Sequence, residues 1–184
     1  APVFIDQEGG RVTRLKSPYW RHPPPAHEFA DLAIAKGADV ATRAIRLNSR
    51  LIAKDLNTLG ISVNCAPVLD IHVDNADPIV GDRALGDEIE RIEKLGSALC
   101  AGLLSGCVLP VIKHIPGHGR ALVDSHKALP TVDTSIEHLM ETDFEAFRSF
   151  NEMPLAMTAH IIFSEIDGNN PVTVSRRVIE KVVR

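Results

Sequence analysis

The 184-residue sequence has no excess of basic residues and no long apolar run, and each absence narrows the possible functions. Its 20 Lys and Arg residues are outnumbered by 24 Asp and Glu residues, which gives a formal net charge of −4. Such a chain offers no basic field for nucleic acid. No apolar run approaches the roughly 18 residues that would indicate a membrane span. We therefore expect no nucleic-acid partner and no membrane contact, but a small or uncharged soluble substrate.

Cysteine is also scarce, and its pattern indicates neither a disulfide framework nor a metal site. The three cysteines, Cys65, Cys100 and Cys107, are an odd number and have no CxxC or other metal-binding spacing. Each lies in an apolar stretch, where a buried reduced thiol is the expected state. This favours a reducing compartment.

The chain opens without Met and without a signal peptide, directly in the apolar segment 2–5. We expect the natural N-terminus to lie further upstream. With 45% hydrophobic and 24% charged residues, the composition is that of an ordinary globular domain. Short apolar runs rich in Val and Ile, each bounded by Gly, Pro or Asp, indicate buried strands at 2–6, 61–71, 108–114 and 155–163.

Apolar residues at helical spacing lie between these runs. They predict one helix over 28–59, ended by Gly60, and another over 89–103, closed by Gly106. A third helix is predicted from Thr134, whose partner Glu137 completes a capping box, through residue 147. Ser175 is a candidate cap for a fourth.

Strand and helix thus alternate four times, which indicates an α/β protein with a parallel sheet covered by helices. The sheet is either open and doubly wound or part of a (β/α)₈ TIM barrel, which typically needs about 250 residues. The segment 8–11 after the first strand reads EGGR and lacks the G-x-G-x-x-G spacing of phosphate-binding doubly wound folds. In a barrel, polar residues at strand ends converge on one site, and such residues here are Asp6, Asp70, Lys113, His114 and His160. We predict a TIM barrel, of which this partial catalytic domain, residues 1–184, covers about four βα units.

The segment after the third strand is the most informative. It reads KHIPGHG over 113–119, and its Pro and Gly residues exclude a helix, so the chain turns sharply into a loop-built site. Lys113 and His114 form a strand-end pair of hydrogen-bond donors, which suits recognition of hydroxyl or carbonyl oxygens on a ligand. The alternative is a pair with a structural role.

Asp124 and His126 lie two residues apart on a segment without periodicity. A turn would bring them into direct hydrogen bonding, and a carboxylate that orients an imidazole makes a proton-transfer dyad that works near neutral pH. By itself, however, an Asp-x-His pair is more typical of a solvated loop.

The first strand ends at Asp6, which could bind two sugar hydroxyls bidentately. Arg11 and Arg14 follow closely and could pair with the acids of this segment structurally instead. Arg83 lies on the loop after the second strand, where it either reaches the ligand or ties down the loop.

Zinc binding is a competing chemistry. Four histidines and two acids could supply three or four ligands of a catalytic zinc site, namely His114, His118, His126 and His160 with Asp6 or Asp124. The i,i+4 spacing of His114 and His118 aligns ligands only on a helix, and a Pro-Gly pair separates these two.

Five segments in the same order resemble glycoside hydrolase family 3, in its β-N-acetylglucosaminidase branch. They are 6–12 (DQEGGRV), 66–70 (APVLD), 81–83 (GDR), 113–119 (KHIPGHG) and 124–126 (DSH). The family fold is a (β/α)₈ barrel. The resemblance implies His126 as the general acid/base, with Asp124 holding it. It implies as ligands of the non-reducing N-acetylglucosamine the residues Asp6, Arg14, Arg83, Lys113 and His114.

The family's nucleophile is an aspartate in a Ser-Asp-Asp-type motif on a later strand, and no acid of this chain fits that motif. We expect the nucleophile beyond Arg184 and the start of the barrel upstream. A partial barrel leaves an unpaired sheet edge and exposed apolar faces, so it should not be a stable isolated monomer.

The resemblance thus implies a retaining β-N-acetylglucosaminidase that acts on peptidoglycan-derived muropeptides in a bacterial cytoplasm. It implies no metal and no organic cofactor, and a monomer for the complete protein. A non-catalytic sugar-binding fragment and a zinc-dependent barrel hydrolase remain as rivals.

Overall fold

A computed structural model of the chain describes residues 1–126 and 128–183. Its first sheet contains three short parallel strands in chain order. Strand β1 (Phe4–Ile5) pairs with β2 (Val63–Asn64), which pairs with β3 (Leu109–Pro110). The three strands lie within predicted strand segments, and their parallel pairing confirms the predicted α/β class.

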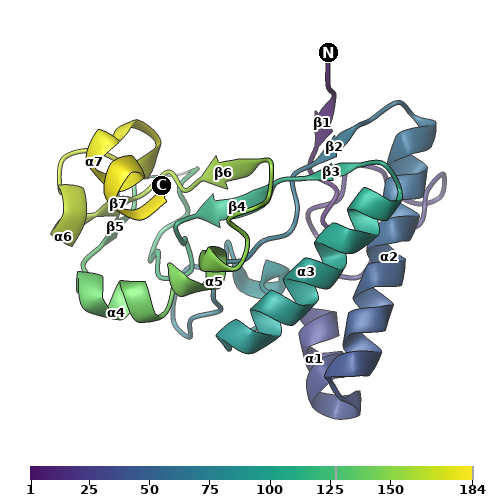
Figure 1. The fold of residues 1–184 in the computed structure, drawn as a ribbon, viewed down its shortest axis with the longest axis horizontal. Coiled ribbons are helices and arrows are strands. Elements are labelled where there is room, and N and C mark those ends of the chain that lie inside the picture. Colours follow the sequence, from purple (N-terminus) through teal and green to yellow (C-terminus); the bar gives the residue numbers. More distant parts are fainter. Residues whose placement is uncertain (127, 184) are drawn as a thin grey trace.

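A second pair of parallel strands lies next to the first sheet. Strand β4 (Ile112–Ile115) follows β3 directly and pairs with β6 (Ala156–Thr158). A parallel bridge between Val68 and Lys113 joins this pair to the segment after β2. Neighbouring strands therefore follow in chain order, as in a barrel wall, although they do not close into a barrel within the described residues (Figure 1).

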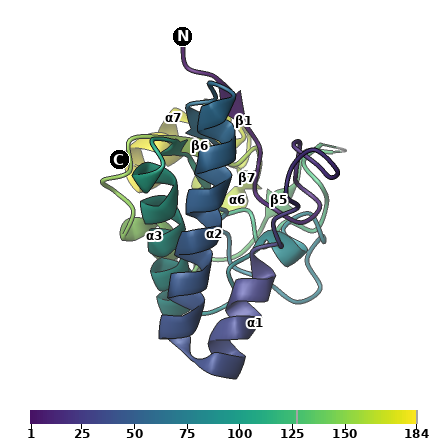
Figure 2. The same cartoon turned by 90° about the vertical axis from the view of Figure 1, so that its right-hand side faces the viewer.

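Three helices cover one face of these strands. They are α1 (His27–Lys36), α2 (Ala38–Thr58) and α3 (Ile89–Ser105). Figure 2 shows α2 and α3 on one side of the strands and the loops of the first 25 residues on the other. The prediction of a single helix over 28–59 was wrong, because Gly37 breaks it with a φ of 92° that continues neither helix.

Helices α2 and α3 pack in close contact because Gly102 of α3 and Gly106, which directly follows α3, carry no side chain. A Cβ on Gly102 would overlap Ser49, and a Cβ on Gly106 would lie 2.5 Å from the Cβ of Ala53. Apolar side chains of all three helices pack against the strand segments in one core, which includes Phe29, Ile45, Leu69, Ile92 and Leu95. This core supports the strand ends from behind.

The predicted end of α2 at Gly60 is confirmed, whereas the backbone after α3 differs from that expected. Gly60, at φ 73°, donates to Asn57 while Ile61 donates to Leu56, which closes α2 with a Schellman motif. After α3 the left-handed position is taken by Cys107, at φ 60°, and not by Gly106. Consequently Cys107 is exposed, contrary to the prediction of three buried thiols, whereas Cys65 and Cys100 are buried and all three are free.

The C-terminal third forms a smaller apolar cluster of its own. It contains β5 (Thr131–Val132), paired in parallel with β7 (Ile162–Phe163), and the short helices α4 (Ile136–Glu141), α6 (Ser164–Asp167) and α7 (Arg176–Val178). Helix α5 (Glu145–Arg148) instead contributes Ala146 and Phe147 to the main core. Strand β5 was not predicted. The cap of α4 is Ser135, which accepts from the His138 amide, and not the predicted Thr134. Ser175 caps α7 as predicted.

No helix in the described part of the chain is long and apolar enough to cross a membrane. Apolar side chains nevertheless lie exposed at the open edge of the sheet, where Val3 and Phe4 are about half exposed. This matches the expectation that a partial barrel leaves apolar surface uncovered.

Candidate active site

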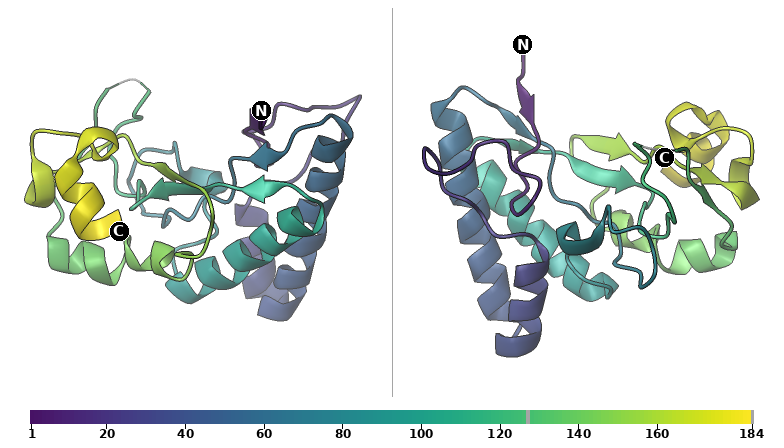
Figure 3. Two further views of the ribbon diagram at one scale, coloured as in Figure 1. Left: turned by 45° about the horizontal axis from the view of Figure 1, so that its top comes forward. Right: turned by 180° about the vertical axis from the view of Figure 1, so that it is seen from behind.

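A cavity of about 330 Å³ lies at the carboxyl ends of the strands, among the loops that follow β1, β2, β4 and β6. In the right panel of Figure 3, which views the molecule from behind, these loops lie in front of the strands. The volume is that of an ordinary small-ligand pocket. Its polar lining comes from Asp6, Glu8, Arg14, Arg83, Lys113, His114, His118, Ser125, His126 and His160. Six of the seven site residues that the resemblance implies, all except Asp124, therefore line one cavity.

Lys113 lies at the base of the cavity and is only 2% exposed. Its ammonium nitrogen is 3.0 Å from Asp6 Oδ1 and 2.6 Å from Glu8 Oε1. Two of its three hydrogens are therefore committed to protein acids, and one is left for a ligand. The prediction that Lys113 and His114 form a pair of donors to a ligand was incomplete. The sequence does not show that the Lys113 ammonium group faces two acids, Asp6 and Glu8, at the end of the first strand segment.

Glu8 is the central acid of this group. Arg83 binds it bidentately, with Nε and Nη2 each 2.9 Å from a carboxylate oxygen, and also donates to the Ile79 carbonyl. Burial opposes the charge on Glu8, but Arg83 and Lys113 hold its pKa below the usual value. Arg83 thus ties down its loop, as one of the two alternatives predicted. It also lines the cavity, and its contact with a ligand stays a prediction.

The other two arginines of the first segment behave differently. Arg14 is exposed and lies 3.6 Å from Asp6 Oδ2, and its backbone amide donates to Gln7 Oε1. Arg11 pairs with Asp82 at 2.6 Å and donates to carbonyls of the loop at 78–80. Arg11 therefore has a structural role, although its partner is Asp82 and not an acid of its own segment. Arg14 lies at the cavity rim, within ion-pair distance of Asp6 as the structural alternative predicted.

Asp70 is the buried anchor of the loop after β4. Its fully buried carboxylate accepts from the backbone amides of His114 and His118 and lies 2.6 Å from His114 Nδ1. Burial disfavours its charge, but the His114 and His118 contacts bring its pKa below the usual value. Because the carboxylate accepts at Nδ1, it presents the other ring nitrogen of His114 to the cavity.

Asp124 and His126 form the predicted dyad. His126 Nδ1 lies 2.8 Å from Asp124 Oδ1, and the same oxygen accepts from the His126 amide at 2.9 Å. The His126 side chain is 81% exposed. A carboxylate on Nδ1 leaves Nε2 as the nitrogen that can exchange a proton with a ligand. The segment is therefore a turn that orients an imidazole largely exposed to solvent, and the role of this imidazole in proton transfer stays a prediction.

The zinc alternative finds no support in this geometry. His114, His118, His126 and His160 each direct a ring nitrogen to a different partner, namely Asp70, Ser125, Asp124 and Thr173. Within residues 1–126 and 128–183, no three His, Cys, Asp or Glu side chains are arranged to hold a metal.

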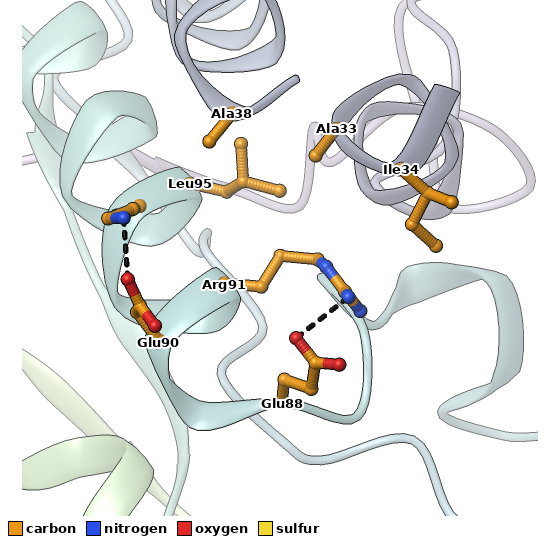
Figure 4. Close-up of a pocket in the computed structure, with 8 residues that line it drawn as sticks. Ala33, Ile34, Ala38, Glu88, Glu90, Arg91 and Leu95 are labelled. Carbon is orange, nitrogen blue, oxygen red and sulfur yellow. Dashed lines mark hydrogen bonds and ion pairs between the residues drawn. The ribbon is translucent and has the colours of Figure 1, made fainter. Parts of the chain in front are cut away.

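A separate hollow of about 220 Å³ lies among the three helices (Figure 4). Its walls are Ala33, Ile34, Ala38 and Leu95, and its rim carries the ion pairs of Arg91 with Glu88 and of Lys94 with Glu90. None of these residues lines the cavity at the strand ends, and their charges are paired with one another. We therefore place the candidate site at the strand ends.

The observed roles of four residues of this site were not predicted from the sequence. Glu8 lies two residues after Asp6 on an extended segment, so the two side chains face the same side, and this period of two was the available signal. Asp70 was predicted only as a strand-end acid and His118 only as a candidate zinc ligand. Ser125 carried no signal, because its contact with His118 depends on how the loop folds back.

Comparison with known proteins agrees with this geometry. Residues 2–184 match the model of the glycosyl hydrolase family 3 N terminal domain. The chain is 34% identical to the beta-hexosaminidase of Methylobacillus flagellatus, over 99% of this chain and 52% of that protein. It is 31% identical to the beta-hexosaminidase LpqI of Mycobacterium tuberculosis, over 96% of this chain and 44% of that protein.

Among solved structures, the chain resembles NagZ from Neisseria gonorrhoeae in complex with N-trifluoroacetyl-D-glucosamine. The TM-score is 0.93 at 30% identity, covering 100% of this chain and 54% of that one. The chain thus spans about half the length of the curated relatives that it matches. It belongs to glycosyl hydrolase family 3, and its 184 residues correspond to that family's N-terminal, TIM-barrel-like domain.

Proposed function

We propose that this chain supplies the sugar-binding and acid/base half of a retaining β-N-acetylglucosaminidase. The observation that carries the proposal is the 2.8 Å contact between Asp124 and His126 Nδ1, at the rim of the cavity that holds Asp6 and Lys113. A carboxylate-oriented imidazole next to a polar pocket is the arrangement that general acid/base catalysis needs.

The sugar is held in this proposal by the charged base of the cavity. Asp6 accepts from hydroxyl groups, and the remaining hydrogen of Lys113 and the exposed guanidinium of Arg14 donate to them. His114 contributes its free ring nitrogen, and Arg83 orders the loop beside it. The relatives named beta-hexosaminidase support an N-acetylhexosaminide as the substrate class.

The proposed reaction is a double displacement. His126 Nε2 protonates the leaving-group oxygen while an aspartate attacks the anomeric carbon, which forms a covalent glycosyl-aspartate. His126 then takes a proton from water, whose oxygen attacks the anomeric carbon and releases the sugar with retained configuration. We expect that aspartate beyond Arg184, since no acid of the described cavity fits the role.

The finer expectations remain proposals. They are a substrate derived from peptidoglycan muropeptides, a bacterial cytoplasmic location, a monomeric complete protein and no requirement for a metal or organic cofactor. The second candidate function is sugar binding without turnover, which rests on the polar lining of the cavity and on the lack of a fitting nucleophile among its described residues.

The test compares two aryl N-acetylglucosaminides, one with a poor and one with an activated leaving group, in the polypeptide that carries the complete barrel. Substituting His126→Ala should lower kcat/KM about 10²–10⁴-fold on the poor leaving group and far less on the activated one. His138→Ala, at an exposed imidazole outside the cavity, is the matched control. Equal losses on both substrates would refute His126 as the acid, and sugar binding without turnover in the unsubstituted protein would support the binding module.

A further inference from the structure

A side-chain hydrogen bond joins the segment that carries the dyad to the base of the cavity. His118 Nε2 lies 3.2 Å from Ser125 Oγ, and Ser125 lies between Asp124 and His126 in the chain. His118 is itself only 4% exposed, and its backbone amide donates to Asp70 at 2.7 Å. A buried, anchored imidazole therefore contacts the residue that precedes the largely exposed His126.

We propose that His118 is a positioning residue, which fixes the Asp124–Ser125–His126 segment over the cavity through its hydrogen bond to the Ser125 hydroxyl. Its role in catalysis rests on the proposed acid/base function of His126. The role in ordering the loop does not depend on that function.

The base to which His118 belongs has little freedom to shift. A Cβ on Gly119 would overlap the Ile71 carbonyl, and a Cβ on Gly117 would lie 2.9 Å from the Asp143 Cβ, so the backbone packs directly against both neighbours. Asp70, which holds the His118 amide, also holds the His114 ring that lines the cavity. The Asp70 carboxylate thus fixes the His114 ring, which lines the pocket, and, through His118, the segment 124–126.

The protonation of His118 suits this role. Its Nδ1 is buried and has no hydrogen-bond partner in the described part of the chain, so a proton there would be an unsatisfied donor. Burial lowers the pKa of His118, against the opposing attraction of Asp70, and His114 and Arg83 are the other charged or titratable groups that act on it. The neutral ring with its proton on Nε2 donates to Ser125 Oγ and leaves Nδ1 unprotonated.

A double-mutant cycle tests the contact in the polypeptide that carries the complete barrel. His118→Ala and Ser125→Ala each remove the same hydrogen bond, one from the buried side and one from the exposed side. Each should lower kcat roughly 10–100-fold through misplacement of His126 and leave KM nearly unchanged, because Asp6 and Lys113 are intact. The double variant should be no worse than the poorer single variant. Losses that multiply in the double variant would overturn the proposal.

Amide hydrogen exchange over 124–126 supplies a readout that needs no turnover. Exchange there should be faster in both single variants than in the unsubstituted protein, and His118→Gln, whose amide can donate to Ser125, should restore part of the protection. If the unsubstituted protein binds but does not hydrolyse, the proposed function fails while the exchange result still decides the loop contact. If His118→Ala does not fold, Ser125→Ala decides alone, and unchanged exchange at 124–126 in that variant would overturn the proposal.

Discussion

Two parts of the segment 113–126 differ in their burial. Its base, over 113–119, is largely buried, and its backbone and side chains are bound by Asp6, Glu8 and Asp70. Its tip, over 120–126, exposes Leu122 to 71% and the His126 side chain to 81%. Two of the proposed sugar-binding groups, Lys113 and His114, thus lie on the buried part, and the proposed proton-transfer group is a largely exposed side chain.

This comparison predicts that substitutions in the base affect stability and that substitutions at the tip affect activity alone. The largest effect on stability is expected at Asp70. Asp70→Ala removes a buried carboxylate and leaves the amides of His114 and His118 unpaired, so the free energy of unfolding should fall by about 3–5 kcal/mol. Urea unfolding followed by circular dichroism measures this. The isosteric Asp70→Asn serves as the milder control, and a loss below about 1 kcal/mol in the alanine variant would contradict a rigid base.

The next effect is expected at Glu8 and depends on pH. Because its folded pKa is lowered, Glu8 contributes stability above its unfolded pKa of about 4.3, and this is lost as pH falls through the folded value. Glu8→Gln should therefore lower the free energy of unfolding by about 2–3 kcal/mol at pH 7, and the difference should shrink below about pH 4.3. Glu90→Gln, the same change on the exposed face of α3, is the matched control and should leave unfolding unchanged. If the difference in the free energy of unfolding between Glu8→Gln and the unsubstituted protein did not change with pH, its cause would be the altered side chain and not the lost charge.

The smallest effect on stability is expected at the tip. His126→Ala should change the free energy of unfolding by less than about 0.5 kcal/mol, because the ring is largely in water in the folded protein as well. Thermal unfolding of the same preparations used for kinetics measures it. A shift as large as that of Glu8→Gln would remove the distinction between base and tip.

Much of the architecture could be predicted from local pattern. The four apolar runs each contain an observed strand, Gly60 ends α2, and Ser175 caps α7. These features depend on a few adjacent residues, which a sequence displays directly. The failures at Gly37, Thr134 and Cys107 are displacements or breaks where a neighbouring residue took the required backbone conformation.

The site was predictable only in part, for the same reason. Asp124 and His126 lie two residues apart, so a turn sufficed to join them. Lys113 and Asp6 are 107 residues apart, and Asp70 is 44 residues from His114. Which acid neutralises which base over such separations depends on strand order, because the pairing of β1 with β2 and the parallel bridge between Val68 and Lys113 set which strand ends are neighbours.

The sequence by itself determined the α/β class, the strand-end acids and bases, and the dyad, because periodicity and short turns are local properties. Only the tertiary structure decided that Lys113 is held by two carboxylates, that Asp70 anchors His114 and His118, and that His118 reaches Ser125. Those contacts arise when distant strand ends are brought to one side of the sheet, where burial makes each charge require a partner.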